Sequence, residues 1–213
     1  FLSGIGYLIF SSSFQIYVFV AIIGVSFTLS SILGEFYKSY KKQKNSSNFL
    51  HSIVKMLLSN RHKNGGYIVH IGIVLLFIGF IGRAFEVEKE FSLSPGEQIY
   101  FSNYVFKLNS IKSEARDNHY AFLSEIDVVD SSTNQLIVNL KPEKRIYFYW
   151  NSDPEKRQPH SELDIYSTIQ KDIYSIFSGY DAQKNIGYFK IMINPLVNWV
   201  WIGGVLMVIG SLF

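Results

Sequence analysis

The stretch Gly65–Gly82, which reads GGYIVHIGIVLLFIGFIG, decides the fold class of this chain because it carries no Asp, Glu, Lys or Arg. Such a run crosses a membrane when a residue or two beyond it extend the helix and Arg83 snorkels to the interface. The stretches 1–34 and 191–213 are equally free of these charged residues. The sequence therefore predicts up to three membrane crossings.

Composition agrees with a membrane protein. Hydrophobic residues make up 48% of the 213-residue chain and aromatic residues 16%, which is high for a soluble protein. The chain contains no cysteine, so it forms no disulfide and no thiolate metal site of its own. It begins with Phe1 and ends inside an apolar run, and we expect it to be a fragment of a longer protein.

The distribution of charge predicts the topology. Residues 35–64 hold seven Lys and Arg residues against the single acid Glu35, whereas the block from Arg83 to Asn194 holds 13 basic and 16 acidic residues. A short, strongly basic loop next to helix ends is retained in the cytoplasm. The block after Arg83 is then expected to be extracytoplasmic.

The block between the second and third apolar stretches predicts β-structure. Short alternating or aromatic runs such as YAFLSEIDVVD are separated by the turn-like clusters Ser-Pro-Gly, Asp-Ser-Ser-Thr-Asn and Asn-Ser-Asp-Pro. This pattern is typical of a mainly antiparallel sandwich or barrel. The predicted fold is a polytopic α-helical membrane protein with an inserted, mainly-β extracytoplasmic domain.

Five segments are predicted along the chain. They are a transmembrane helix with its preceding loop at 1–34, a basic cytoplasmic loop at 35–64, a transmembrane helix at 65–85, the β-rich domain at 86–193 and a transmembrane helix at 194–213. The basic loop contains SSNFLHSIVKMLLSN, which predicts either an interfacial or an ordinary surface helix. The last helix is expected to use Asn194 as its N-cap and Pro195 as its first residue.

His70 is the strongest functional candidate, because an imidazole inside an uncharged transmembrane stretch must be paired, buried in a bundle or ligated. The residues alone leave open whether it binds another helix or a cofactor. The other histidines, His51, His62, His119 and His160, fit surface positions, and no zinc-binding spacing links them. No catalytic residue is identified. The aromatic run 147–150 fits a sheet core or a binding surface.

Three stretches together resemble the CcmF family of haem lyase subunits of cytochrome c maturation. They are NGGYIVHIGIVLLFIG at 64–79, LKPEKRIYFYW with SELDIYSTIQKDIYSIF at 140–177, and INPLVNWVWIGGVLMVIGS at 193–211. The resemblance implies that His70 is an axial ligand of haem b, and that the β-rich domain is periplasmic on a bacterial inner membrane protein. It also implies that the second ligand and a tryptophan-rich WWD segment lie outside this chain, so that the fragment alone is inactive.

The resemblance further implies partners: the haem chaperone CcmE, an apocytochrome c CxxCH segment and other Ccm membrane subunits, with no nucleic acid. Seven positions in the family-like motifs are candidates for docking, namely Pro142, Glu143, Arg145, Ser161, Glu162, Asp172 and Tyr174. Glu143 and Arg145 are also expected to pair within the sheet. Two functions remain open: a haem-handling assembly factor, and a non-catalytic membrane anchor that presents a β domain.

Overall fold

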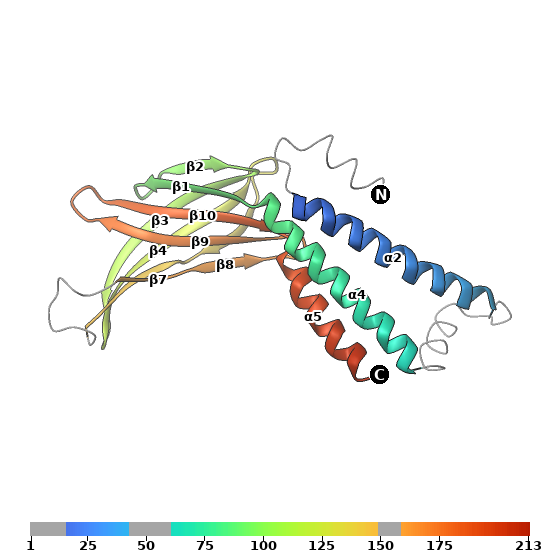
Figure 1. Ribbon diagram of the computed structural model, residues 1–213. Coiled ribbons are helices and arrows are strands. Elements are labelled where there is room, and N and C mark those ends of the chain that lie inside the picture. Colours follow the sequence, from blue (N-terminus) through green and yellow to red (C-terminus); the bar gives the residue numbers. More distant parts are fainter. Residues whose placement is uncertain (1–15, 43–60, 149–158) are drawn as a thin grey trace. The chain divides into compact units, whose positions relative to one another are not determined.

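A computed structural model describes residues 16–42, 61–148 and 159–213 (Figure 1). The chain forms two compact units. One, the helical unit, comprises Phe1–Phe85 and Pro195–Phe213; the other, the β unit, comprises Glu86–Asn194. The possible helix within SSNFLHSIVKMLLSN lies outside the described residues.

The helical unit contains α2 (Ile16–Lys42), α4 (Arg61–Gly82), the 3-10 turn η1 (Arg83–Phe85) and α5 (Val197–Ser211). Among the described residues, α2 and α4 are long and apolar enough to cross a membrane, whereas α5 has only 15 residues. Both long helices continue into the predicted basic loop, since α2 extends to Lys42 and α4 begins at Arg61. Lysine and arginine are good helix formers, so charge ends an apolar run without ending a helix.

The predicted start of the last helix is wrong. Strand β10 extends to Pro195, and the N-cap is Leu196 with a left-handed backbone (φ 64°) and no side-chain cap. Pro195 therefore closes a strand instead of opening a helix, and α5 begins at Val197, two residues later than predicted.

Glycines allow α4 and α5 to pack with their backbones in contact. A Cβ atom at Gly72 would lie 2.7 Å from the carbonyl oxygen of Gly203, and one at Gly203 would lie 2.6 Å from the carbonyl oxygen of Gly72. One end of the pair repeats this arrangement, because a Cβ atom at Gly65 would lie 2.6 Å from the oxygen of Gly210. Such close approach of small residues is a main source of helix association in membranes.

The β unit consists of two antiparallel sheets. The four-stranded sheet has the order β1 (Val87–Leu93), β10 (Ile186–Pro195), β9 (Lys171–Asp181), β8 (Asp164–Ser167). The six-stranded sheet has the order β2 (Gln98–Phe101), β3 (Tyr104–Ala115), β4 (His119–Asp130), β6 (Glu143–Tyr147), β7 (Pro159–Glu162), with β5 (Leu136–Leu140) also paired to β4. The first and last strands of the unit pair with each other, Val87 opposite Ile193.

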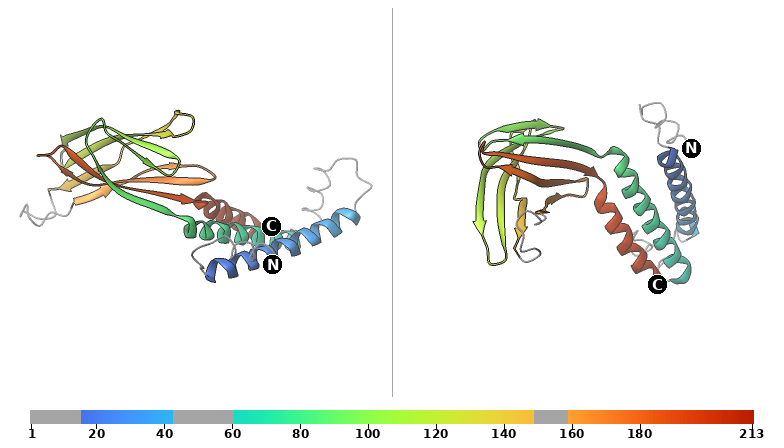
Figure 2. Two further views of the ribbon diagram at one scale, coloured as in Figure 1. Left: turned by 90° about the horizontal axis from the view of Figure 1, so that it is seen from above. Right: turned by 60° about the vertical axis from the view of Figure 1, so that its left-hand side comes forward.

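A single hydrophobic core joins the two sheets. Phe106, Leu108 and Ile126 come from the six-stranded sheet, and Phe177 and Phe189 come from the four-stranded sheet. The rings of Phe177 and Phe189 stack with centroids 4.9 Å apart. Figure 2 shows the two sheets as separate layers. Of the two predicted arrangements, the unit is therefore a sandwich and not a barrel.

Two of the three predicted turn clusters lie in described turns. The first contains Gly96 (φ 94°) between β1 and β2, and the second contains Asn134 (φ 55°) between β4 and β5. In the second turn the carboxylate of Asp130 accepts hydrogen bonds from Ser132 and Thr133. These bonds, that of the Ser132 hydroxyl first, lower the pKa of Asp130 to about 2. The third cluster, at 151–154, lies outside the described residues.

The contact between α4 and α5 predicts that alanine at Gly72 destabilises the helical unit. Because the added Cβ would meet the backbone of α5, the helices must separate, at a cost of about 1–3 kcal/mol. Thermal unfolding of the detergent-solubilised protein, followed by circular dichroism, measures this. The matched control is Gly66→Ala in the same helix, where a Cβ would meet nothing within 4 Å. Equal melting temperatures for the two variants would contradict the packing described.

Candidate functional site

His70 lies in the middle of α4 and is exposed. Within the described part of the chain it has no hydrogen bond or ion pair. Gly72 packs against α5, and His70 lies about 160° around the helix from Gly72, given about 100° per residue. The imidazole therefore projects from the side of α4 that faces away from α5.

This side of α4 faces α2. Tyr67, three residues before His70, donates its hydroxyl to Glu35 of α2 (3.4 Å), and Val74, four residues after His70, lines a cavity shared with α2. Residues three and four apart lie on one face of a helix. The helical unit therefore places His70 on the seam between α2 and α4.

At one end of this seam, charged groups join the two helices. Glu35 is the only acidic residue in the stretches 1–85 and 195–213. Its carboxylate accepts from Lys38 (3.2 Å) and from Lys63 of α4 (3.4 Å), besides Tyr67. All three charged side chains are exposed to a large extent, so we assign this cluster to the ends of the helices and not to their centre.

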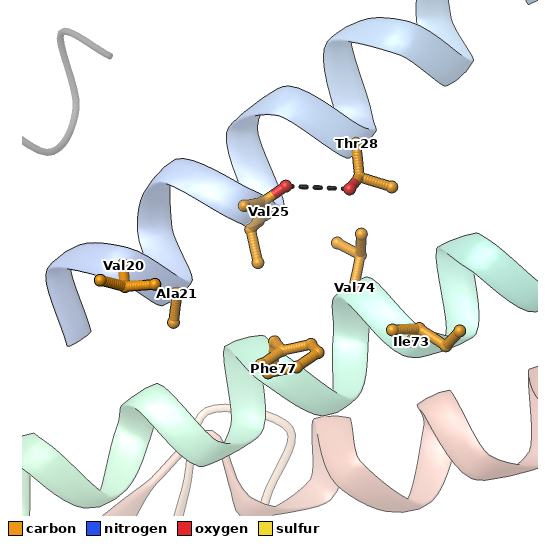
Figure 3. Close-up of a pocket in the computed structure, with 8 residues that line it drawn as sticks. Val20, Ala21, Val25, Thr28, Ile73, Val74 and Phe77 are labelled. Atoms are coloured by element: carbon orange, nitrogen blue, oxygen red, sulfur yellow. Dashed lines mark hydrogen bonds between the residues drawn. The ribbon is translucent and has the colours of Figure 1, made fainter. Parts of the chain in front are cut away.

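On the other side of His70 the seam opens into an apolar groove of about 260 Å³ (Figure 3). It is lined from α2 by Val20, Ala21, Gly24, Val25 and Thr28, and from α4 by Ile73, Val74 and Phe77. The hydroxyl of Thr28 donates to the carbonyl oxygen of Gly24 in its own helix (2.9 Å), as the dashed line in Figure 3 shows. The side chains of the groove therefore offer a ligand no unused hydrogen-bond donor.

The seven predicted docking positions do not form one site. Five of them, Pro142, Glu143, Arg145, Ser161 and Glu162, lie in or next to the paired strands β6 and β7. Asp172 and Tyr174 lie in β9, in the other sheet. Their surroundings are accordingly described separately.

Glu143 and Arg145 belong to a row of alternating charges. The guanidinium of Arg145 contacts Glu143 (2.9 Å) and Glu162 (3.2 Å), and Arg116 contacts Glu143 (3.4 Å) and Glu114 (3.3 Å). Hydrogen bonds to Tyr147 and Glu143 raise the pKa of Arg145. The expected pairing of Glu143 with Arg145 is confirmed. Further ion pairs connect it to Glu114 in β3 and to Glu162 in β7.

Ser161 and Pro142 have structural contacts. The hydroxyl of Ser161 donates to the carbonyl oxygen of Phe177 in the other sheet (3.0 Å) and accepts from Lys144 (2.9 Å). Burial lowers the pKa of Lys144. Pro142 is buried, and its carbonyl oxygen accepts the hydroxyl of the buried Ser124 (2.8 Å). These contacts connect neighbouring strands and the two sheets.

Asp172 is buried and accepts hydrogen bonds from Ser167 (2.6 Å) and Tyr174 (3.5 Å). Burial, followed by the charge of Asp172, raises the pKa of Tyr174. The phenol therefore stays protonated and serves as a hydrogen-bond donor.

His119 differs from its prediction as a surface residue. It is only 7% exposed, its Nδ1 lies 2.6 Å from Oδ1 of Asn118, and its Nε2 has no partner. Its ring packs against Tyr147, which also contacts His160. The alternation of His119 with the buried Ala121 along β4 is the pattern that indicates its burial. His160 is exposed as predicted, whereas the side chains of His51 and His62 lie outside the described part.

The aromatic run 147–150 is described only in part. Tyr147 contacts His119 and His160, and Phe148 contacts the exposed Tyr120 edge to face at 4.7 Å. Both residues are half-buried and lie outside the core cluster, so the sheet-core alternative is wrong for them. Among the described residues, no three His, Cys, Asp or Glu side chains form a metal-binding group.

Comparison with known proteins identifies the β unit. A family model described as "CcmF C-terminal beta-sandwich" matches residues 84–195, which is more than half of the chain. A solved structure, "Cytochrome c Heme Lyase CcmF", superposes with a TM-score of 0.69 at 16% identity, over 99% of this chain and 32% of its own length. At that identity the superposition shows the fold alone.

Curated relatives agree with the family model. Cytochrome c-type biogenesis protein CcmF of Haemophilus influenzae is 24% identical over 193 residues, which is 90% of this chain and 28% of that protein. Cytochrome c-type biogenesis protein ccl1 of Rhodobacter capsulatus is 28% identical over 142 residues, which is 66% of this chain and 20% of that protein. The chain spans less than a third of the length of these relatives. By its sandwich and its sequence, the chain belongs to the CcmF family.

Proposed function

We propose that this chain is part of a haem lyase of cytochrome c maturation, in which His70 is one axial ligand of a b-type haem. The observation that carries the proposal is the position of His70. It is an exposed imidazole without a hydrogen-bond partner among the described residues, in the middle of an apolar helix. In a membrane such a group requires a partner, and neutral imidazole is a common ligand of haem iron.

The surroundings of His70 fit a haem ligand. The seam between α2 and α4 supplies apolar side chains on one side of it, and these exclude water from a bound macrocycle. His70 would bind iron through the lone pair of a ring nitrogen. When bound, a haem with protein axial ligands would supply redox chemistry at this site. The role of this chain is to hold and orient it.

The β unit is proposed to act as a docking domain. In this proposal it lies in the periplasm of a bacterial inner membrane protein and positions a haem chaperone such as CcmE, an apocytochrome c segment and other Ccm membrane subunits. Its sandwich is a rigid support, since one core joins both sheets. The internal partners of Glu143 and Arg145 argue that these residues shape the support instead of binding directly.

The membrane topology belongs to the same proposal. We assign α2 and α4 as spanning helices and α5 as a third one, which spans with the help of flanking residues because its own length is about 22 Å at 1.5 Å per residue. The basic loop 35–64 is then cytoplasmic.

The ligand assignment predicts that His70→Ala lowers the haem content of the purified full-length protein by more than about tenfold, the loss typical of disturbed metal sites. Absorbance of the haem per mole of protein measures it. His160→Ala, which changes an exposed histidine of the β unit, is the control and is expected to keep the haem. Unchanged haem content in His70→Ala would contradict the assignment of His70 as a haem ligand and favour the membrane-anchor function.

The topology predicts where reporter fusions are active. A reporter inserted near Lys42 is expected to behave as cytoplasmic, because Lys42 lies in the loop 35–64 and the seven basic residues of that loop keep it inside. A reporter inserted near Ser132, beyond the next spanning helix, is expected to behave as periplasmic. Paired fusions of alkaline phosphatase and a cytoplasmic fluorescent protein measure this. The reverse pattern would overturn the orientation.

The charge row predicts that Arg145→Ala destabilises the β unit by about 1–2 kcal/mol, between the values for exposed and buried pairs. The reason is that Glu143, whose side chain is 17% exposed, loses its closest cation. Thermal unfolding measures it. Lys112→Ala, in an exposed pair at 4.0 Å, is the control and costs less than about 0.5 kcal/mol. Full stability together with lost binding of an apocytochrome peptide would instead identify Arg145 as a docking residue.

A further inference from the structure

The apolar groove between α2 and α4 lies directly beside His70, on the same face of α4. Ile73 and Val74 follow His70 by one turn, and Phe77 follows it by two turns; all three line the groove. From His70 to Phe77 the distance along the helix axis is about 10 Å at 1.5 Å per residue, comparable with the width of a porphyrin ring. A planar group held by His70 can therefore extend along this seam.

We propose that the groove receives one edge of the tetrapyrrole that His70 ligates, and that Ala21 and Gly24 of α2 determine its width. This inference rests on the proposed function and adds to it the part of the chain that positions the ring. The side chains that line the groove are apolar except for the Thr28 hydroxyl, which donates within its own helix. Such a lining suits the hydrocarbon edge of a macrocycle and does not suit its carboxylates.

Gly24, an exposed residue of α2, is the one lining residue of the groove without a side chain. A Cβ atom at Gly24 would meet nothing within 4 Å, so this glycine is not required for helix packing. The glycines of α4 that face α5 are different, because a Cβ atom at Gly72 would meet the backbone of the neighbouring helix. Gly24 thus leaves open space on the His70 side of the helical unit. We assign that space to the ligand.

Gly24→Leu in the full-length protein tests the inference, because Gly24 lines the groove and a Cβ atom there would meet nothing within 4 Å. We expect the affinity for haem to weaken by about tenfold, because overpacking a site costs on the order of 1.4 kcal/mol. The haem that remains bound is expected to show a shifted Soret band. Gly24→Ala is expected to give a smaller effect in the same direction. The matched control is Gly204→Leu in α5, where a Cβ would also meet nothing within 4 Å.

Thermal unfolding of the haem-free variants shows whether folding is retained. If Gly24→Leu lowers the melting temperature, Ala21→Leu, one turn earlier in the same groove, replaces it. His70→Ala is measured in parallel. Haem lost in His70→Ala but unchanged in both groove variants would overturn the groove inference and leave the ligand assignment intact, with a lipid chain or another helix as the occupant. Haem retained in His70→Ala would overturn the proposed function itself.

Discussion

The contact between the backbones of α4 and α5 is the constraint on which the helical unit depends. Gly65 and Gly72 place a bare Cα on one face of α4, and Gly210 and Gly203 do the same on α5, so the two helices meet without intervening side chains. In lipid this close packing replaces the hydrophobic effect as a source of association. It also fixes the rotation of α4 about its axis. With the glycine face turned to α5, His70 has to face the side of α2.

The β unit is built as an insertion between these two helices. Its first strand pairs with its last, β1 with β10, so the chain enters and leaves the sandwich on adjacent strands of one sheet. The two sheets have different roles. The four-stranded sheet carries both chain connections, whereas the six-stranded sheet carries the row of charges from Glu114 to Glu162. Ser161 connects them across the sandwich through the carbonyl oxygen of Phe177.

Sequence patterns predicted the features that depend on residues close together in the chain. The uncharged run around His70, the sandwich-or-barrel pattern and the turn at Asp130 depend on hydropathy, alternation and turn residues within a few positions. What sequence missed depends on distant contacts. Leu196 became a left-handed N-cap because β10 continues to Pro195, and His119 is buried because it packs against Tyr147 of another strand. The groove beside His70 was not foreseeable, since it requires the register between α2 and α4.

The position of Glu35 explains why charge does not reach His70. This acid is the only one in residues 1–85. Its carboxylate accepts hydrogen bonds from two lysines and from Tyr67 at one end of the seam, so its charge is paired there. Tyr67 lies one helical turn before His70, and beyond His70 the described residues of α2 and α4 line the apolar groove. Glu35 is therefore paired elsewhere, and the described helical unit contains no other carboxylate that could pair with His70. An imidazole inside a membrane requires a partner, and the haem proposed for His70 would supply one beside the apolar seam.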